Sequence, residues 1–354
     1  MSGQLRQGGD PLGLQRVIAP RGMLPQAADT IDNTLPAYRN EAVIDVTVLN
    51  IDAASFVQLE GVHAAGGSTI AEQIHAIVAA RGKMQNPVTG SGGMLLGTLR
   101  AVGPDYDGPM LGVAPGTQVA TLVSLTLTPL QLHGIVAVLP LAHQVQVRGV
   151  AILPPSAPIA VVPADLPESL VLSVLDVCGA PALVDRWARQ LPECGHLVVL
   201  GCGKAGLLSL AAARHVRPDL RLWAIDRFAG PAEQLHAAGL CDGWAALDAT
   251  DAVAVRDQVQ AWTGGLGAHA TVNMASLPGT EMATVLATRQ RGLCLFFGMA
   301  TSFSRVALGA EGVGADVDLL IGNGYAQNHA AYALDLVRRD KATQALLRQR
   351  FQIQ

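Results

Sequence analysis

Three glycines spaced as G-x-G-x-x-G carry the clearest chemical signal in this 354-residue chain. Gly201, Gly203 and Gly206 stand between the apolar run HLVVL and an alanine-rich stretch typical of a helix. In a strand–loop–helix unit these glycines allow a tight turn, let the backbone approach a pyrophosphate and bring helix and strand together. We therefore predict a dinucleotide-binding loop. Cys202 and Lys204 lie within it as neighbours of the phosphates, and we assign Cys202 no redox role.

An acidic residue after the loop indicates which dinucleotide would bind. Asp226 ends the apolar run RLWAID, twenty residues after Gly206, where a carboxylate accepts hydrogen bonds from both hydroxyls of the adenosine ribose. It would repel a 2′-phosphate, whereas Arg227 could attract one or stack on adenine. We predict NAD rather than NADP. The alternative is that Asp226 is a strand-end residue that caps the next helix.

The second half of the chain has the pattern of a doubly wound α/β domain. After Leu166, helical and strand patterns alternate in units of roughly 25 to 30 residues. The candidate strands are nearly continuous in apolar residues, as strands buried on both faces are. They lie at 196–200, 220–225, 269–274 and 293–297. We predict a Rossmann domain over residues 161–340.

The first half has the pattern of a compact β domain over residues 1–160. EAVIDVTVLNID, from Glu41, alternates apolar and polar residues as a strand with one buried face does, and residues 70–80 have the spacing of a short amphipathic helix. Short apolar runs separated by Pro or Gly follow until the composition changes near Pro154 and Pro155.

Charge and cysteine usage exclude several classes of protein. The net charge is −4 and the only basic cluster is Arg338-Arg339, so a nucleic-acid partner is not expected. No apolar run is long enough to cross a bilayer and the start lacks a signal-peptide core, so we expect no membrane association. The five cysteines contain no CxxC pair, as in a reduced cytoplasmic enzyme.

Taken whole, the sequence resembles the medium-chain dehydrogenase/reductase superfamily, in which a GroES-like β domain precedes a Rossmann domain. The resemblance implies that residues 341–354 return as a helix and strand to complete the first domain. Asp52 stands where zinc-dependent members carry their first cysteine ligand, and Ser91-Gly92 stand where they carry His-Glu. No tetrahedral N/S ligand set remains, so the resemblance implies a member without metal.

Three segments narrow the resemblance to the family of L-erythro-3,5-diaminohexanoate dehydrogenases: RVIAPRGMLPQAADTIDN, LNIDAASF and RGKMQNPVTGSGGMLLG. This resemblance implies NAD-dependent oxidation of a 3-amino group, hydrolysis of the imine, and release of ammonium and 5-amino-3-oxohexanoate in lysine fermentation. It also implies that Asn273 and Gly298, in HATVNMASLPGT and FFGMATS, neighbour the cofactor. Their alternative roles are a strand terminus and a tight turn.

Without a metal, side chains must hold the amine and the water and supply a base. Glu60 or His63 could be the base, although His63 could be an exposed residue of a glycine-rich loop. Lys83 could bind the substrate carboxylate, with Arg81 as a competitor for that role, or be a surface cation. Asn86 and Ser91 could contact the reacting groups. Alternatively, Asn86 could make an Asx turn before Pro87, and Ser91 could be the small residue needed between glycines.

Two other functions remain open from the sequence. One is a metal-free quinone or enoyl reductase that uses NADPH, and the other is a protein that binds dinucleotide without turnover. Such a reductase would have an apolar site, so Asp226 and the polar residues at 83–91 argue against it. By analogy with relatives that join their nucleotide domains edge to edge, GNGYAQ at 322–327 predicts a homodimer or homotetramer.

Overall fold

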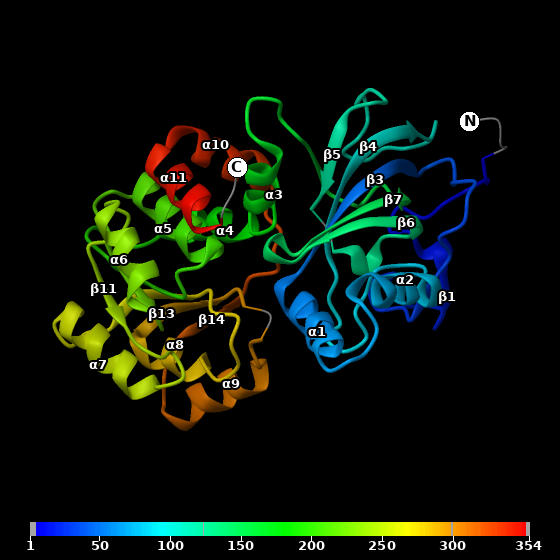
Figure 1. The fold of residues 1–354 in the computed structure, drawn as a ribbon. Helices are drawn as coiled ribbons and strands as arrows, with labels where there is room; N and C mark the ends of the chain where they lie inside the picture. The colour runs from blue at the N-terminus through cyan, green and yellow to red at the C-terminus, as the bar shows by residue number, and fades with distance from the viewer. Residues whose placement is uncertain (1–4, 123, 299, 352–354) are drawn as a thin grey trace. The chain divides into compact units, whose positions relative to one another are not determined.

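The computed structural model describes residues 5–122, 124–298 and 300–351 (Figure 1). The chain divides into two compact units, Met1–Glu168 and Ser169–Gln354. The boundary therefore lies a few residues beyond the predicted one at 160. None of the helices in the described residues is long and apolar enough to span a membrane.

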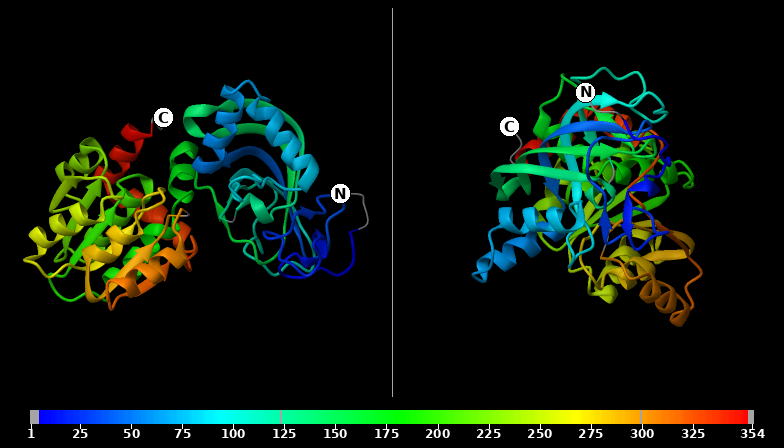
Figure 2. Two further views of the ribbon diagram at one scale, coloured as in Figure 1. Left: turned by 90° about the horizontal axis from the view of Figure 1, so that it is seen from below. Right: turned by 90° about the vertical axis from the view of Figure 1, so that its right-hand side faces the viewer.

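The first unit is built on a six-stranded antiparallel sheet with the strand order β6-β7-β3-β4-β5-β8. Figure 2 shows how strongly its long strands curve. The alternation predicted from Glu41 is β3 (Ala42–Ile51), at the centre of the sheet. The other strands are β4 (Gly93–Val102), β5 (Gln118–Thr121), β6 (Leu130–Leu139), β7 (Gln144–Leu153) and β8 (Ile159–Val161). A separate ribbon pairs β1 (Val17–Ala19) with β2 (Thr30–Ile31).

Two helices connect β3 to β4. The predicted helix is α2 (Ile70–Arg81), which begins with a capping box of Thr69 and Glu72 and ends at Gly82, whose φ is 72°. Its buried side chains, Ile70, Ile74 and Val78, join the core of this unit. Short 3₁₀ turns lie elsewhere in the unit, at Leu14–Arg16, Leu125–Leu127 and Pro140–Ala142.

The other helix, α1 (Ala53–Ala64), was not predicted. Residues around His63 were expected to form a glycine-rich loop, but the helix continues through Ala64 and the loop follows it. Gly61 lies within the helix, where a single glycine is tolerated at a cost of about 1 kcal/mol relative to Ala. Asp52 caps α1 through a hydrogen bond from the Ser55 backbone N–H, which helps to explain why the helix starts there.

A buried ion pair fastens the N-terminal segment to the first unit. The guanidinium of Arg16 donates from Nε and Nη2 to the two carboxylate oxygens of Glu41, at 2.6 Å each. Both side chains are almost completely buried. Arg16 Nη1 also donates to the carbonyls of Asp32 and Thr34. The pair thus joins three stretches of chain that are distant in sequence.

The second unit contains the predicted parallel sheet, in the strand order β11-β10-β9-β12-β13-β14. Its strands are β9 (His196–Leu200), β10 (Arg221–Asp226), β11 (Gly243–Ala246), β12 (Ala268–Asn273), β13 (Thr288–Phe296) and β14 (Asp318–Ile321). Since β9 lies between β10 and β12, the chain changes direction across the sheet at this strand. Ligands of such sheets bind beyond the carboxyl ends of the strands at this switch point.

Helices cover both faces of this sheet (Figure 1). One group packs around α5 (Lys204–Val216), and another around α8 (Glu281–Ala287). The first group contains α4 (Gly179–Ala188), α10 (His329–Arg339) and α11 (Lys341–Arg350), and the second contains α7 (Ala252–Thr263) and α9 (Phe303–Gly312). The remaining helices are α3 (Glu168–Leu175) and α6 (Ala229–Ala237). These layers are those of the predicted Rossmann domain.

The described end of the chain is helical and packs elsewhere than predicted, and residues 352–354 of the expected return strand lie outside the described residues. After Arg339, Asp340 caps a second helix, α11, by accepting a hydrogen bond from the Thr343 backbone N–H. This helix packs on α5 and α10, so the described part of 341–354 belongs to the second unit and does not complete the first.

Candidate functional site

The glycine loop follows β9 and leads directly into α5. Gly201 has a φ of 92°, a conformation that L side chains rarely adopt. A Cβ on Gly206 would lie 1.9 Å from the Gly201 carbonyl oxygen, which is far inside van der Waals contact. A Cβ on Gly203 would meet nothing within 4 Å. No side chain would therefore fit where Gly206 meets Gly201, whereas the space at Gly203 is open. A pyrophosphate could approach the backbone there.

Asp226 is held against this loop. Its Oδ2 accepts a hydrogen bond from the Cys202 backbone N–H at 2.8 Å, and its Oδ1 accepts one from the Phe228 backbone N–H at 3.0 Å. A carboxylate has about four acceptor positions, so both oxygens can still accept from ribose hydroxyls. The side chain is thus fixed by two backbone groups and remains able to bind a ribose.

The other loop residues have no reactive character. Cys202 is buried, and burial raises the pKa of its thiol well above the usual range. The ammonium of Lys204 lies 3.7 Å from Asp176 and 5.4 Å from the centre of the Phe351 ring. Arg227 is mostly exposed and lies 3.7 Å from Asp248. Lys204 is thus half-buried and Arg227 mostly exposed, and each lies near a carboxylate.

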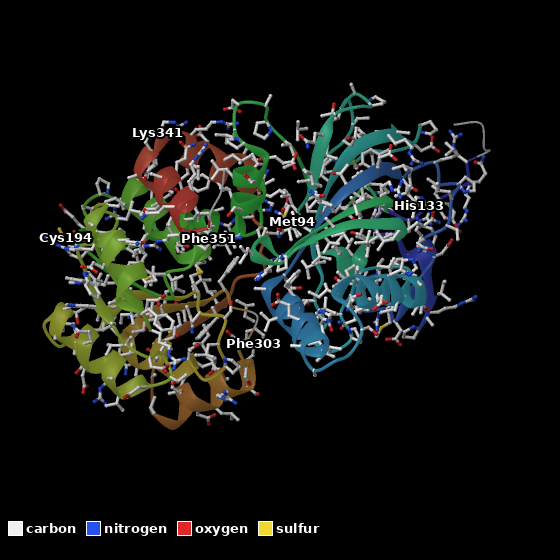
Figure 3. The ribbon with its side chains drawn as sticks, in the orientation of Figure 1. Met94, His133, Cys194, Phe303, Lys341 and Phe351 are labelled. Carbon is white, nitrogen blue, oxygen red and sulfur yellow. The ribbon has the colours of Figure 1, made fainter. Side chains whose placement is uncertain are left out.

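Arg350 braces the glycine loop from the end of α11, and sequence reasoning did not identify it. Its Nη1 donates to the Cys202 carbonyl at 2.9 Å, its Nε donates to Gln234 Oε1 at 2.6 Å, and its Nη2 contacts the Pro231 carbonyl. Figure 3 labels the next residue, Phe351. Nothing in the local sequence distinguishes Arg350 from the other arginines of this basic helix.

Replacing Arg350 by leucine should weaken dinucleotide binding. Leucine keeps an apolar stem but removes three hydrogen bonds that link the loop, α6 and α11, and each such bond to a charged donor contributes about 1.5–3 kcal/mol. We expect the Kd for NAD, measured by calorimetry, to rise about tenfold or more. Arg348→Leu on the same helix serves as the control. An unchanged Kd in Arg350→Leu would contradict the bracing role.

Asn273 and Gly298 both have structural roles in the second unit. Asn273 is fully buried, and its Nδ2 donates to the hydroxyls of Thr280 and Thr284 at 2.9 Å each. A Cβ on Gly298 would lie 2.4 Å from the Ala275 carbonyl oxygen. Side-chain contact between Asn273 and a cofactor is therefore not evident, because its amide nitrogen is already used.

In the first unit, three hydroxyl groups meet in a ring at the start of α1. Ser55 Oγ lies 2.6 Å from Thr89 Oγ1 and 2.9 Å from Ser91 Oγ, and the latter two atoms are 3.0 Å apart. Ser55 is buried, Ser91 is half-buried and Thr89 is exposed. We call these three side chains the hydroxyl ring. It joins Ser91, predicted as a site residue, to Ser55 and Thr89, which belong to the same two polar stretches of the sequence.

Asp52 lies one helical turn from the hydroxyl ring. Its Oδ1 accepts the capping hydrogen bond from the Ser55 backbone N–H at 2.9 Å. Its Oδ2 is shielded from solvent and has no hydrogen-bond partner among the described residues. A buried carboxylate oxygen without a partner is costly unless a ligand satisfies it. The position of a lost cysteine ligand was the only sequence signal for Asp52.

Two other predicted residues are used by the fold. Lys83 is fully buried, and its Nζ donates to the Pro25 carbonyl at 2.6 Å; burial lowers its pKa to about 8. Asn86 Oδ1 accepts from the Val88 backbone N–H at 2.8 Å, and its Nδ2 donates to Gln58 at 2.7 Å. Neither arrangement is the predicted contact with substrate: Lys83 binds the N-terminal segment, and Asn86 makes the Asx turn.

Glu60 and His63 lie farther along α1 than the hydroxyl ring. At about 1.5 Å per residue, Glu60 is roughly 7.5 Å and His63 roughly 12 Å along the helix axis from Ser55. Glu60 is half-buried and forms no hydrogen bond or ion pair with a described residue. His63 is exposed near Glu72, whose pKa is lowered mainly by hydrogen bonds from Thr69 and slightly by His63.

The described residues contain no cluster of three or more His, Cys, Asp or Glu side chains that could hold a metal ion. Asp52 and Ser91, at the positions that the sequence resemblance compared with zinc ligands, supply one carboxylate and one hydroxyl. These are hard oxygen donors, whereas catalytic zinc sites use three protein ligands rich in nitrogen and sulfur. The donor set does not fit such a site.

Comparison with known proteins identifies relatives along nearly the whole chain. A family model described as the L-erythro-3,5-diaminohexanoate dehydrogenase N-terminal domain matches residues 15–163. The L-erythro-3,5-diaminohexanoate dehydrogenase of Fusobacterium nucleatum is 41% identical over 341 residues, covering 96% of each chain. That of Acetoanaerobium sticklandii is 41% identical over 330 residues, covering 93% of this chain and 95% of the relative.

Solved structures share the fold at low sequence identity. A mycobacterial quinone oxidoreductase matches with a TM-score of 0.55 and 20% identity, covering 90% of this chain and 86% of that one. An alcohol dehydrogenase from Thermotoga maritima matches with a TM-score of 0.54 and 12% identity, covering 89% and 85%. These likenesses confirm the predicted fold class, an antiparallel β domain followed by a Rossmann domain.

Proposed function

The chain belongs to the L-erythro-3,5-diaminohexanoate dehydrogenase family, and from that premise we propose that it oxidises the C3 amine of L-erythro-3,5-diaminohexanoate with NAD. The products are 5-amino-3-oxohexanoate, ammonium and NADH. The observation that carries this proposal is 41% identity to two dehydrogenases of that name over more than nine-tenths of the chain. A glycine loop facing a fixed carboxylate supports the cofactor.

A bound nicotinamide dinucleotide supplies the acceptor for the hydride from C3. The protein has to orient it, and the loop of Gly201, Gly203 and Gly206 would hold the pyrophosphate at the start of α5. Asp226 would accept from the ribose hydroxyls, and its charge would disfavour the extra phosphate of NADP. NAD is therefore the proposed cofactor, with Arg227 near the adenine.

A general base must take a proton from the C3 ammonium, because hydride leaves readily only from the neutral amine, and a water must then attack the imine carbon. We assign the base to Glu60 in preference to His63. Glu60 is half-buried and unpaired among the described residues, so its carboxylate remains available. His63 is exposed and lies beside Glu72.

The pH dependence of the reaction should separate these two candidates. Glu60→Gln should lower kcat by about 10²- to 10⁴-fold, the usual contribution of a general base, and remove the acidic limb of the pH–kcat profile. His63→Gln is the matched control on the same helix and should leave both unchanged. If His63→Gln removed the limb instead, the base would be His63. If both variants kept the acidic limb of the pH–kcat profile, neither residue would be the base.

Absorbance at the NADH band tests the function directly. Purified protein should reduce NAD only when 3,5-diaminohexanoate is added, with stoichiometric release of ammonium, and elemental analysis of the same preparation should find no stoichiometric zinc. Oxidation of NADPH by quinones or enoyl compounds would favour a reductase instead. Tight dinucleotide binding without turnover on any β-amino acid would favour a non-catalytic protein.

We also propose a homodimer or homotetramer in the cytoplasm that acts in lysine fermentation. The edge strand β14 pairs only with β13 in the described sheet, and its Ile321 side chain is 60% exposed. An exposed edge can pair with a second copy. Light scattering measures the oligomeric state.

The cysteines support the cytoplasmic location. All five are free and four are buried, which suits a reducing compartment.

A further inference from the structure

We propose that Asp52 and the hydroxyl ring of Ser55, Thr89 and Ser91 form an alkylammonium site that holds the C5 ammonium of the substrate. This rests on the proposed function and extends it, because the site would select a diamino acid over a simple β-amino acid. Asp52 and its neighbours would thus determine specificity, while the chemistry takes place at C3.

The hydrogen-bond count of the ring decides what kind of ligand it can take. Three hydroxyl groups carry three hydrogens, and the three contacts of 2.6, 2.9 and 3.0 Å use all of them when each group donates once. Thr89 Oγ1 also accepts from the Ser91 backbone N–H at 3.4 Å, so a lone pair is left on the oxygens of Ser55 and Ser91, and none of the three groups has a hydrogen to offer. The closed ring is a set of acceptors. It disfavours a carboxylate or phosphate and favours a group with several N–H donors.

Asp52 gives this acceptor set a negative charge. Its Oδ1 is occupied by the Ser55 backbone N–H, in the same helical turn as the Ser55 hydroxyl. Its Oδ2 is shielded and unpartnered, and no cationic side chain among the described residues forms an ion pair with it. An ammonium carries one positive charge and three donors. It would neutralise the carboxylate and offer hydrogens to the acceptors around it.

The same chemistry distinguishes the two amines of the substrate. A nearby negative charge and hydrogen-bond acceptors stabilise an ammonium and raise its pKa. The C3 nitrogen must lose its proton before hydride leaves, so such a site would slow the reaction if it held that nitrogen. The C5 nitrogen stays charged throughout. The Asp52 site therefore suits C5.

The test compares 3,5-diaminohexanoate with 3-aminohexanoate, which lacks the C5 amine. Asp52→Asn keeps a side-chain oxygen to cap α1 but replaces the charged acceptor by a neutral amide that can donate. Wild-type protein should prefer the diamine by about 100-fold or more in kcat/KM, since a site with buried polar groups rejects an analogue that leaves them unpaired. In Asp52→Asn that ratio should fall below about tenfold, mainly through KM for the diamine.

Two further variants complete the design. Thr89→Val removes one hydroxyl of the ring and keeps a side chain of the same shape as threonine. It should also reduce the preference for the diamine. Asp105→Asn makes the same chemical change at an exposed carboxylate of the first unit, which pairs with Arg39, and should leave the ratio unchanged. Equal losses on both substrates in Asp52→Asn, or an unchanged ratio, would overturn the C5 assignment.

Direct binding separates this inference from the proposed function. The affinity for 3,5-diaminohexanoate, measured by calorimetry in the presence of NADH, should fall by about tenfold or more in Asp52→Asn. If wild-type protein bound the diamine through Asp52 but never reduced NAD or NADP, the dehydrogenase proposal would fail and the ammonium site would stand. If wild-type protein oxidised the diamine and Asp52→Asn bound it equally well, the dehydrogenase proposal would stand and the ammonium site would fail.

Discussion

Asp226→Ser is expected to lower kcat/KM for NAD by roughly 10- to 100-fold, while kcat/KM for NADP falls much less or rises. The carboxylate is fixed by the backbone N–H groups of Cys202 and Phe228, so it is already oriented to accept from the ribose hydroxyls. A hydrogen bond to a charged group contributes about 1.5–3 kcal/mol. Serine also removes the repulsion that a 2′-phosphate would meet. Steady-state rates with both cofactors measure the change.

Asp219→Ser is the matched control for that experiment. Asp219 precedes β10 and Asp226 ends it, so the two substitutions remove the same charge from opposite ends of one strand. Asp219 is half-buried, pairs with Arg217 and accepts from the Cys194 backbone N–H, at the opposite end of β10 from the glycine loop. The control should leave the NAD/NADP ratio unchanged. An unchanged ratio in Asp226→Ser itself would remove Asp226 from the ribose site.

Arg16→Met is expected to reduce the free energy of unfolding by about 3–5 kcal/mol, the usual cost of leaving one partner of a buried ion pair without the other. The carboxylate of Glu41 would lose both bonds from the guanidinium while remaining buried. The carbonyls of Asp32 and Thr34 would lose their donor as well. Urea denaturation followed by circular dichroism measures the change.

Two controls separate burial from charge in this prediction. Arg39→Met breaks the exposed pair with Asp105 and should barely move the denaturation midpoint, because solvent screens such pairs. The double variant Arg16→Met/Glu41→Leu removes both charges and should regain part of the lost stability. A midpoint in Arg16→Met equal to that of Arg39→Met would show that the buried pair contributes no more than a surface pair.

Residues that neighbour one another in sequence were predicted well. The glycine loop needs its strand, turn and helix in immediate succession, so Gly201, Gly203, Gly206 and the strand ending at Asp226 were visible as a pattern. The same holds for β3 and α2, whose periodicity reflects one buried face each. By contrast, α1 has weakly segregated apolar residues and an internal glycine, so its pattern predicted no helix, and His63 was expected in a glycine-rich loop.

The end of the chain was misplaced for a different reason. The segment after 340 has helical composition, but which surface a helix packs on depends on the partner it meets, and the pattern of the helix does not specify that partner. The structure packs α11 on α5 and places Arg350 against the glycine loop. No residue spacing could have revealed a contact that spans nearly 150 positions.

By itself, the sequence determined the two-part fold, the dinucleotide loop and its acidic partner, and the family, because each depends on local spacing or on similarity along the chain. Tertiary structure decided which polar side chains are free to act. Lys83 and Asn86 were plausible ligands until folding gave their polar atoms backbone and side-chain partners. Asp52 gained importance because folding buried one of its oxygens without placing a donor from the described residues beside it. Hydrogen-bond partners are set by approach in space, and that approach is absent from the order of residues.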